Sequence, residues 1–178
     1  MSSKIAFKGT YEDIEALAGA LRKLVLERMG QEHPRAGEMV RWTTEKLGGE
    51  IKVSEDPSKL EEESGSLAIY RKGRFVIFLS PYTSPLRDNF TIAHEIGHYF
   101  LHFDHKNQPS NGPVIFNRYG SGRDEWQANR FAAAFLMPKE EFLEVYERYG
   151  RNTRLVAGHF EVSEPAVQVR AIYIVPKR

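Results

Sequence analysis

Two histidines four residues apart, His94 and His98, stand in the middle of a stretch that is well suited to form a helix. A Ser-Pro pair typical of an N-cap and first turn precedes this stretch, and residues 86–102 contain only one helix-weakening residue, Gly97. Positions i and i+4 share one face of a helix, so the two imidazoles can converge on one ion. Imidazole nitrogens suit zinc, and the spacing therefore predicts a metal-binding helix in the fold.

Glu95 follows the first of these histidines directly. It is rotated by about 100° from His94 around a helix of 3.6 residues per turn, so it cannot join the same pair of ligands. It can, however, reach a water molecule bound to the metal beside them. We expect Glu95 to act as a general base.

Two acidic residues compete for the role of third ligand. Where the third ligand follows the motif closely, a glycine turns the chain back toward the metal. Leu101 occupies that glycine position here, so the later Asp104 is expected to be carried away from the ion. Glu125 is the better candidate, because it begins a second apolar, alanine-rich helix that runs to Met137 and ends before a proline.

Asn129 lies one helical turn after Glu125 and on the same face. Its side-chain oxygen could accept the second ring N–H of a metal-binding histidine and so fix the tautomer. His102 continues the face of the two motif histidines, but it is about 12 Å from His94 along a helix axis. We therefore expect His102 to support a ligand or to pack, rather than to bind the metal.

The remaining candidates have no distinctive spacing. His105 and Tyr119 lie in a long irregular stretch, residues 103–123, where either could stabilise an oxyanion, although plain loop side chains are the simpler interpretation. His33 and His159 stand outside any cluster in the sequence.

Composition limits the class of protein. The chain has 178 residues, of which 41% are hydrophobic, which suits one core, and we expect a single domain over residues 1–178. It contains no cysteine, so the ligands of a metal must be histidines and carboxylates. No apolar leader or membrane-spanning stretch is evident, which predicts a soluble, cytoplasmic protein. The net charge of +1 gives no electrostatic argument for nucleic-acid binding.

Hydrophobic periodicity and breaker residues divide this domain into three parts. Residues 1–49 should form N-terminal helices at 11–29 and 38–47, and residues 139–178 a helical tail with helices at 139–149, 153–160 and 164–173. Residues 50–138 should contain a strand near 50–54, a polar connection at 56–66, a hairpin of strands 67–70 and 74–79, and the two metal-site helices. We expect a strand within residues 67–79 to align an extended substrate.

Residues 155–167 of the tail have the pattern of a helix-turn-helix. Arg151, Arg154 and Arg170 could then contact DNA. The near-neutral charge favours the alternative, in which these short helices pack on the rest of the domain.

Two segments, Phe90–His102 and Glu125–Pro138, resemble the ImmA/IrrE metallopeptidases. A weaker similarity extends from about Val40 to Val169. The resemblance implies that His94, His98 and Glu125 bind the metal and that Glu95 is catalytic. It also implies that the substrate is a helix-turn-helix repressor, cleaved to derepress stress-response or mobile-element genes.

The sequence thus predicts an α+β, zincin-like fold, in which a small, mostly antiparallel sheet packs on a helical body that carries the motif helix and ends in a helical tail. The expected function is that of a zinc-dependent endopeptidase, with another divalent metal such as Mn²⁺ as an alternative cofactor. The alternative function is a non-proteolytic regulatory protein that holds a repressor or DNA around a structural metal site. Glu95 argues against this alternative, because a structural site has no use for a base.

Overall fold

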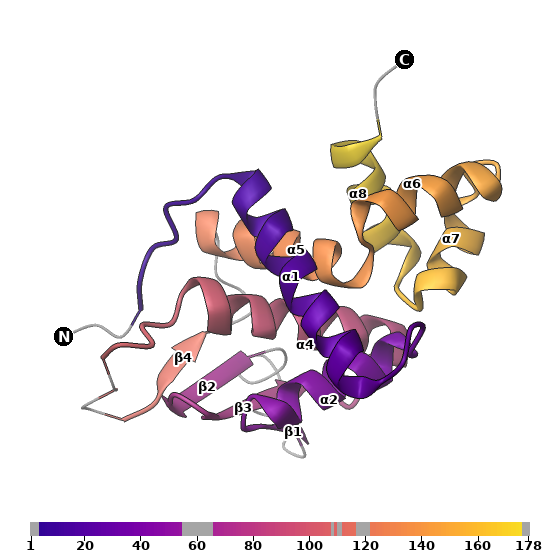
Figure 1. Cartoon of the computed structure of the whole chain (residues 1–178). Coiled ribbons are helices and arrows are strands. Elements are labelled where there is room, and N and C mark those ends of the chain that lie inside the picture. The colour runs from indigo at the N-terminus through magenta and orange to yellow at the C-terminus, as the bar shows by residue number, and fades with distance from the viewer. Residues whose placement is uncertain (1–3, 55–65, 108, 110–111, 117–121, 176–178) are drawn as a thin grey trace.

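The computed structural model describes residues 4–54, 66–107, 109, 112–116 and 122–175. These residues form an α+β fold of seven helices and a four-stranded mixed sheet. In chain order the elements are α1 (Tyr11–Met29), α2 (Ala36–Lys46), β1 (Gly49–Val53), β2 (Ser66–Arg71), β3 (Arg74–Leu79), α4 (Pro85–Leu101), β4 (Val114–Phe116), α5 (Arg123–Leu136), α6 (Lys139–Arg148), α7 (Thr153–Phe160) and α8 (Glu164–Ile174). The sheet lies at one end of the molecule and the tail helices α6 to α8 lie at the other, with α4 and α5 between them (Figure 1).

A capping box begins helix α1, and a left-handed glycine ends it. Thr10 and Asp13 form a capping box, in which each side chain accepts a hydrogen bond from the other residue's backbone N–H. Gly30 ends the helix in the left-handed conformation, with φ of 66°. Farther along, Arg22 donates a hydrogen bond to the backbone oxygen of Phe135, which fixes α1 across α5.

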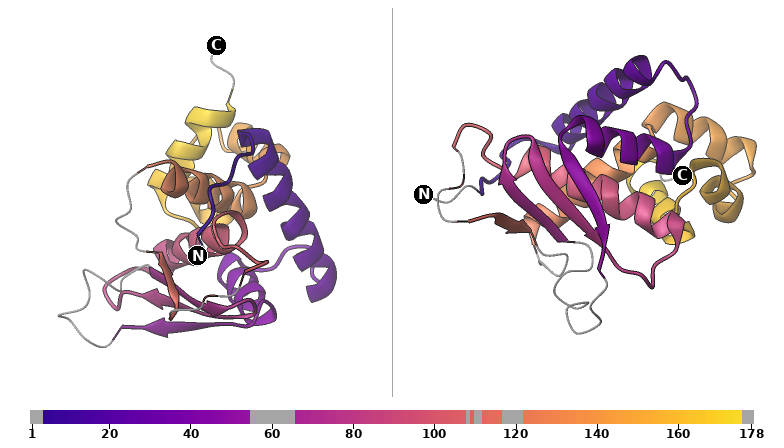
Figure 2. Two further views of the ribbon diagram at one scale, coloured as in Figure 1. Left: turned by 90° about the vertical axis from the view of Figure 1, so that its left-hand side faces the viewer. Right: turned by 90° about the horizontal axis from the view of Figure 1, so that it is seen from below.

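The sheet has the strand order β1-β3-β2-β4, and two of its three pairings are antiparallel. The predicted hairpin is confirmed as β2 and β3, which turn at Gly73 with φ of 73°. The N–H of Gly73 donates to the hydroxyl of Tyr99 on α4 at 3.0 Å, and the rings of Phe75 and Tyr99 are 4.5 Å apart. These contacts hold the sheet against the helix that carries the motif (Figure 2).

Strand β4 is an element that the sequence did not reveal. The stretch 103–123 was expected to be irregular, yet Val114–Phe116 pairs antiparallel with β2. The pairing also contradicts the expectation that a strand within residues 67–79 aligns an extended substrate, because such a strand needs an unpaired edge. Both β2 and β3 are interior strands with a neighbour on each side, so neither has a free edge along its paired residues.

Helices α4 and α5 cross closely at Gly97. A Cβ atom built on this glycine would lie 3.2 Å from the backbone oxygen of Ala128 and 3.2 Å from the Cβ of Phe131. The glycine that weakens the motif helix on its own is therefore what allows the second helix to approach it.

Most of the predicted helix boundaries agree with the structure to within two residues, whereas the polar connection at 56–66 lies almost entirely outside the described residues.

The tail is attached to the body through a buried arginine. Arg170 of α8 donates to the backbone oxygen of Met137 and to the hydroxyl of Tyr11, and it forms an ion pair with Glu15 of α1. Apolar residues of α6, α7 and α8 join the same buried cluster as those of the sheet and of α4 and α5. The tail thus packs on the rest of the molecule.

Candidate metal centre

His94 and His98 face one another on α4. Ser84 caps this helix by accepting a hydrogen bond from the N–H of Arg87, and Pro85 occupies its first turn, as the sequence predicted. Both histidines are buried, and their Nε2 atoms are 3.0 Å apart. The helical spacing of the motif therefore brings the two rings together.

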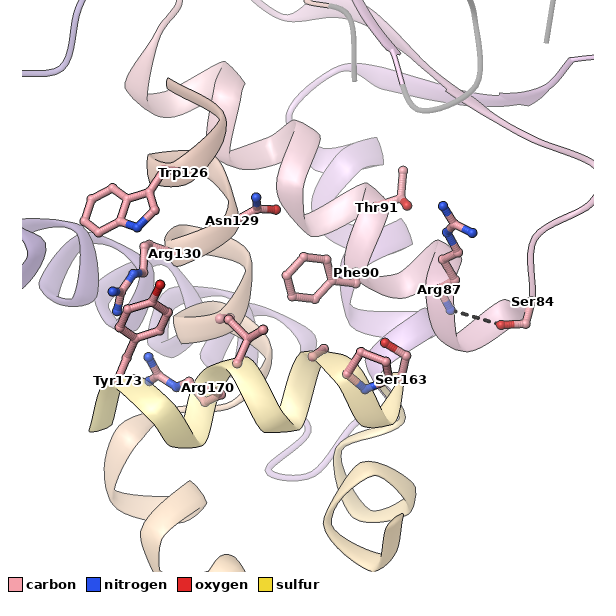
Figure 3. A pocket seen from close by; sticks show the side chains of 14 residues that line it. Ser84, Arg87, Phe90, Thr91, Trp126, Asn129, Arg130, Ser163, Arg170 and Tyr173 are labelled. Carbon is pink, nitrogen blue, oxygen red and sulfur yellow. Dashed lines mark hydrogen bonds between the residues drawn. The ribbon is translucent and has the colours of Figure 1, made fainter. Parts of the chain in front are cut away.

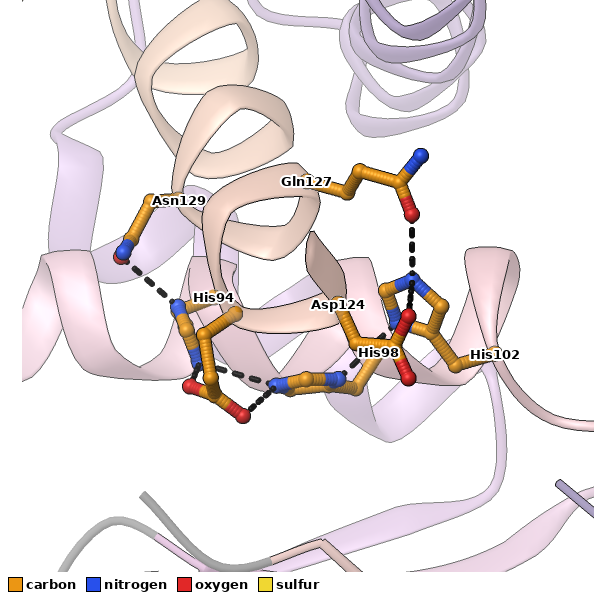
Figure 4. Close-up of polar contacts among 7 residues, drawn as sticks. His94, His98, His102, Asp124, Gln127 and Asn129 are labelled. Carbon is orange, nitrogen blue, oxygen red and sulfur yellow. Dashed lines mark hydrogen bonds and ion pairs between the residues drawn. The ribbon is translucent and has the colours of Figure 1, made fainter. Parts of the chain in front are cut away.

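Glu125, in the first turn of α5, completes a group of three. Its Oε2 atom is 3.2 Å from the Nε2 atom of His94, and its Oε1 atom is 3.1 Å from that of His98. Figure 4 shows the rings of His94 and His98 side by side, with Asn129 next to His94. The rejected candidate, Asp104, lies elsewhere, where its carboxylate accepts hydrogen bonds from Lys106 and Asn107. The structure brings together the three residues that the sequence proposed as ligands.

The separations of these donor atoms fit a metal ion. Zinc binds imidazole nitrogen and carboxylate oxygen at about 2.0–2.2 Å in a tetrahedral arrangement, which puts neighbouring ligand atoms about 3.3–3.6 Å apart. The three contacts among His94, His98 and Glu125 measure 3.0–3.2 Å. With the Nε2 atom of each imidazole unprotonated, the two rings and the carboxylate would direct lone pairs at one another across such distances, and a cation bound between them would offset this repulsion.

The other ring nitrogen of His94 has a partner that determines its tautomer. The Nδ1 atom is 2.9 Å from the Oδ1 atom of Asn129, the contact that the sequence predicted. An amide oxygen can only accept, so Nδ1 carries the hydrogen and Nε2 presents its lone pair to the group of three.

His98 is oriented by a longer chain of contacts. Its Nδ1 atom is 3.0 Å from the Nδ1 atom of His102, and the Nε2 atom of His102 is 3.0 Å from the Oε1 atom of Gln127. The amide nitrogen of Gln127 donates to the backbone oxygen of Phe7, which fixes which end of the amide faces His102. His102 therefore donates through Nε2 and accepts through Nδ1, and His98 is left with a lone pair at Nε2.

Sequence reasoning expected His102 to be a supporting residue but found neither Gln127 nor Phe7. The Gln127 amide reaches a backbone atom 120 residues earlier in the chain, and no local pattern marks that contact. The N-terminal segment is held in place there by a hydrogen bond from the N–H of Ile5 to the backbone oxygen of His102.

With this geometry established, residues 50–171 match the model of the IrrE N-terminal-like domain, which describes the Peptidase_M78 family. The matched segment is more than half of the chain. The protein belongs to the Peptidase_M78 family. No curated protein and no solved structure matches the chain. Family membership supports a metallopeptidase-type function and confirms the resemblance on which the sequence interpretation drew.

The electrostatics of the Peptidase_M78 site favour ligand protonation states that bind a metal. Burial lowers the pKa of His98 to about 4, although contact with Glu125 acts in the opposite direction. Burial alone would raise the pKa of Glu125, but its contacts with His94 and His98 outweigh this and lower it to about 2. His98 is thus neutral and Glu125 ionised at neutral pH, as metal ligands must be.

Glu95 lies on the same turn of α4 as His94 and is buried, with 1% of its surface exposed. Beside the group, the ring of Phe116 stacks on His98 with a centroid separation of 5.0 Å, which brings β4 to the metal centre. Strand β4, at one edge of the sheet, therefore contacts the group through Phe116.

The other candidates from the sequence do not join this centre. His105 contacts the backbone oxygen of Tyr99 at 2.8 Å, and His159 contacts Glu141 at 3.3 Å. His33 is exposed, and Tyr119 lies outside the described residues.

Two of the three tail arginines that the sequence offered as DNA contacts interact with carboxylates within the protein. Arg170 is buried against Glu15, and Arg151 forms an ion pair with Glu147 one turn earlier. Of the three, Arg154 is exposed. The described part of the chain also contains no helix that is long and apolar enough to cross a membrane.

Proposed function

We propose that this protein is a zinc-dependent endopeptidase. The observation that carries the proposal is the convergence of two imidazole nitrogens and a carboxylate at separations suited to one tetrahedral ion, with Glu95 on the adjoining face of the same helix. Three protein ligands leave a fourth position for water or substrate, which is the arrangement of a catalytic rather than a structural zinc site.

In this proposal His94, His98 and Glu125 would hold the ion, and the bound ion would supply Lewis acidity. Glu95 accepts the proton of the attacking water on its carboxylate and later delivers that proton to the leaving amine nitrogen. Asn129 and His102 keep the two imidazoles in the required tautomers. The two nitrogen ligands and one oxygen ligand also suit Mn²⁺ as an alternative metal.

Strand β4 is suited to align the scissile peptide. Among the described residues it pairs with β2 on one side, and its Phe116 stacks on His98. An extended substrate could add to its other side through main-chain hydrogen bonds, as peptides do at open sheet edges. This assigns to β4 the role that the sequence had given to the hairpin.

The substrate is proposed from the resemblance to the ImmA/IrrE metallopeptidases. We infer that it is a helix-turn-helix repressor, whose cleavage derepresses stress-response or mobile-element genes in the cytoplasm. The near-neutral charge and the engaged arginines of the tail support a protein substrate over a nucleic acid.

The deciding experiment incubates the protein with helix-turn-helix regulators from the same genome, with and without chelator. The unaltered protein should cut one of these regulators, and only when metal is present. Glu95→Gln should keep the metal and the fold yet lose cleavage, because an amide of nearly the same shape cannot act as a base. Full biological activity of Glu95→Gln would instead support the non-proteolytic alternative.

A further inference from the structure

A groove of about 580 Å³ lies between α4, α5 and α8, outside the group of metal ligands. This volume is within the usual range of ligand-binding pockets. Its lining includes Phe90 of α4, Ala133 of α5 and Val169 of α8, and it is mainly apolar. Figure 3 shows α8 running across one side of the groove, with Phe90 and Asn129 pointing into the space above it.

Large apolar side chains are exposed along this groove. Trp126 is 41% exposed, Val169 49% and Tyr173 47%. Exposed aromatic and aliphatic side chains that gather in a concave surface are typical of a binding site.

The charged residues that line the groove are arginines and include no carboxylate. Arg170 is neutralised by Glu15, so Arg87 and Arg130 set the sign of the surface. Arg87 is exposed, and the described residues provide no ion-pair partner for it. The groove thus combines apolar walls with positive charge.

Arg130 is the more informative of the two cations. It is only 8% exposed, and its guanidinium stacks on Tyr173 and Trp126, at 3.0 Å and 4.7 Å from the ring centroids. Its buried Nε atom has no hydrogen-bond partner among the described residues. Among the described residues Arg130 forms no ion pair, and the carboxylate of Glu15 acts on it only through a longer-range Coulombic interaction. An occupant that carries a carboxylate would give this buried cation a direct partner.

The groove adjoins the proposed catalytic centre. Asn129 lines it and also contacts His94, and Thr91, which lines it too, precedes His94 by one turn of α4. A peptide that fills the groove would therefore contact Asn129, the partner of one of the three proposed ligands.

We propose that this groove binds a segment of the protein substrate in which apolar side chains are flanked by carboxylates. The inference rests on the proposed peptidase function and adds to it a recognition surface that is separate from the scissile bond. It also gives the tail helix α8 a function in substrate selection in place of DNA recognition.

Binding is tested apart from cleavage in the zinc-loaded Glu95→Gln protein. The probe is the fluorescein-labelled peptide Ser-Glu-Leu-Phe-Glu-Leu-Ser, and its anisotropy reports binding. Two control peptides replace every Glu by Lys or every apolar residue by Ser. With Trp42→Phe added, Trp126 is the remaining tryptophan of the chain, so its emission reports whether the groove is occupied.

Matched variants on one helix localise the binding. Val169→Glu places a carboxylate in the groove and should weaken the acidic peptide by about tenfold or more. Ile172→Glu makes the same change at a 68% exposed position of α8 outside the groove and should leave affinity unchanged. Arg87→Gln should weaken binding by about two- to fivefold and reduce its salt dependence.

Equal affinity in the Val169 and Ile172 variants, or equally tight binding of the lysine peptide, would overturn the proposal. The proposal would also be overturned if the parent protein self-associates and Val169→Glu does not, because the groove would then be an interface between two copies of the chain. Failure of the peptidase proposal gives a different pattern, in which the acidic peptide binds the groove but the unaltered protein cuts no regulator. If cleavage occurs and Val169→Glu does not raise KM for the regulator, the groove proposal alone fails.

Discussion

His94 and His98 carry the same side chain but are held by different partners. One is oriented by the single amide of Asn129, and the other by His102, which in turn depends on Gln127. All three imidazoles are buried, and so is Gln127, whereas Asn129 is exposed in the groove. Water could therefore not easily replace His102 or Gln127. The affinity for the ion should therefore depend on residues that do not touch it.

We expect Asn129→Ala to weaken zinc affinity or activity by roughly 10–100-fold without abolishing either, the usual effect of losing a partner of a ligating histidine. Zinc titration and thermal melting of the same variant provide the measurement. A lower melting temperature with unchanged zinc affinity would show that Asn129 serves the fold and not the site.

At the scale of elements, the proposed metal centre depends on how closely α4 and α5 approach. The ligands come from both helices, and Gly97 lies where they cross. The tail adds a second constraint, because the contact of Arg170 with Glu15 joins α8 to α1 beside the groove. Each contact gives a prediction.

Gly97→Ala should lower the free energy of unfolding by about 1–2 kcal/mol, because overpacking at the crossing outweighs the helix propensity that alanine gains. The new methyl group would press on the backbone of α5, so zinc affinity should fall as well. The matched control is Gly19→Ala in α1, where nothing lies within 4 Å of the added Cβ. This change should stabilise the protein by up to about 1 kcal/mol. Chemical denaturation measures both, and equal effects would contradict the close approach.

The ion pair of Glu15 makes stability depend on pH. Burial would raise the pKa of Glu15, but hydrogen bonds from Arg170 and Tyr11 outweigh it and hold the pKa below its ordinary value of 4.5. The contribution of Glu15 to stability is therefore complete above pH 4.5 and lost as the pH falls through the lower value in the folded protein.

Melting temperatures at a series of pH values test this. Glu15→Gln should be less stable than the parent at pH 7, and the difference should shrink on acidification below about pH 4.5. Glu27→Gln, at an exposed glutamate of the same helix, should show no such convergence. A constant difference across the pH range would exclude the ion pair as its origin.

On the scale of the whole molecule, one ion would tie together parts of the chain that lie far apart. The ligands span residues 94–125, and their supports extend back to Phe7. Ligand binding to the folded state alone stabilises it by about 2.7 kcal/mol when the free ligand is at 100 times its Kd.

Removing the metal with a chelator should therefore lower the melting temperature, and adding zinc should restore it. His94→Ala and Glu125→Ala should lose this response, whereas His33→Ala, at an exposed histidine outside the group of three, should keep it. Elemental analysis should find about one equivalent of metal in the parent protein. Ligand variants that bind zinc as tightly as the parent would show that the ligands are assigned wrongly.

The features that the sequence predicted are those that depend on local periodicity. The helical pairing of His94 with His98 and the start of the next helix at Glu125 follow from spacing and breaker residues. Strand β4 was missed because three residues among glycines and prolines are too short to show alternation. Gln127 was missed because its role depends on Phe7, and Arg170 seemed available to DNA because its partner lies 155 residues away.

The succession of contacts from Phe7 through Gln127 and His102 to His98 has a spectroscopic consequence. Each of the three buried imidazoles carries one N–H proton that faces a protein acceptor and not solvent. Such protons exchange slowly with water, so they should give separate resonances downfield of the amide region in a proton NMR spectrum. The signals of His98 and His102 should shift together when Gln127 is replaced, which would make the order of the contacts visible without any measurement of activity.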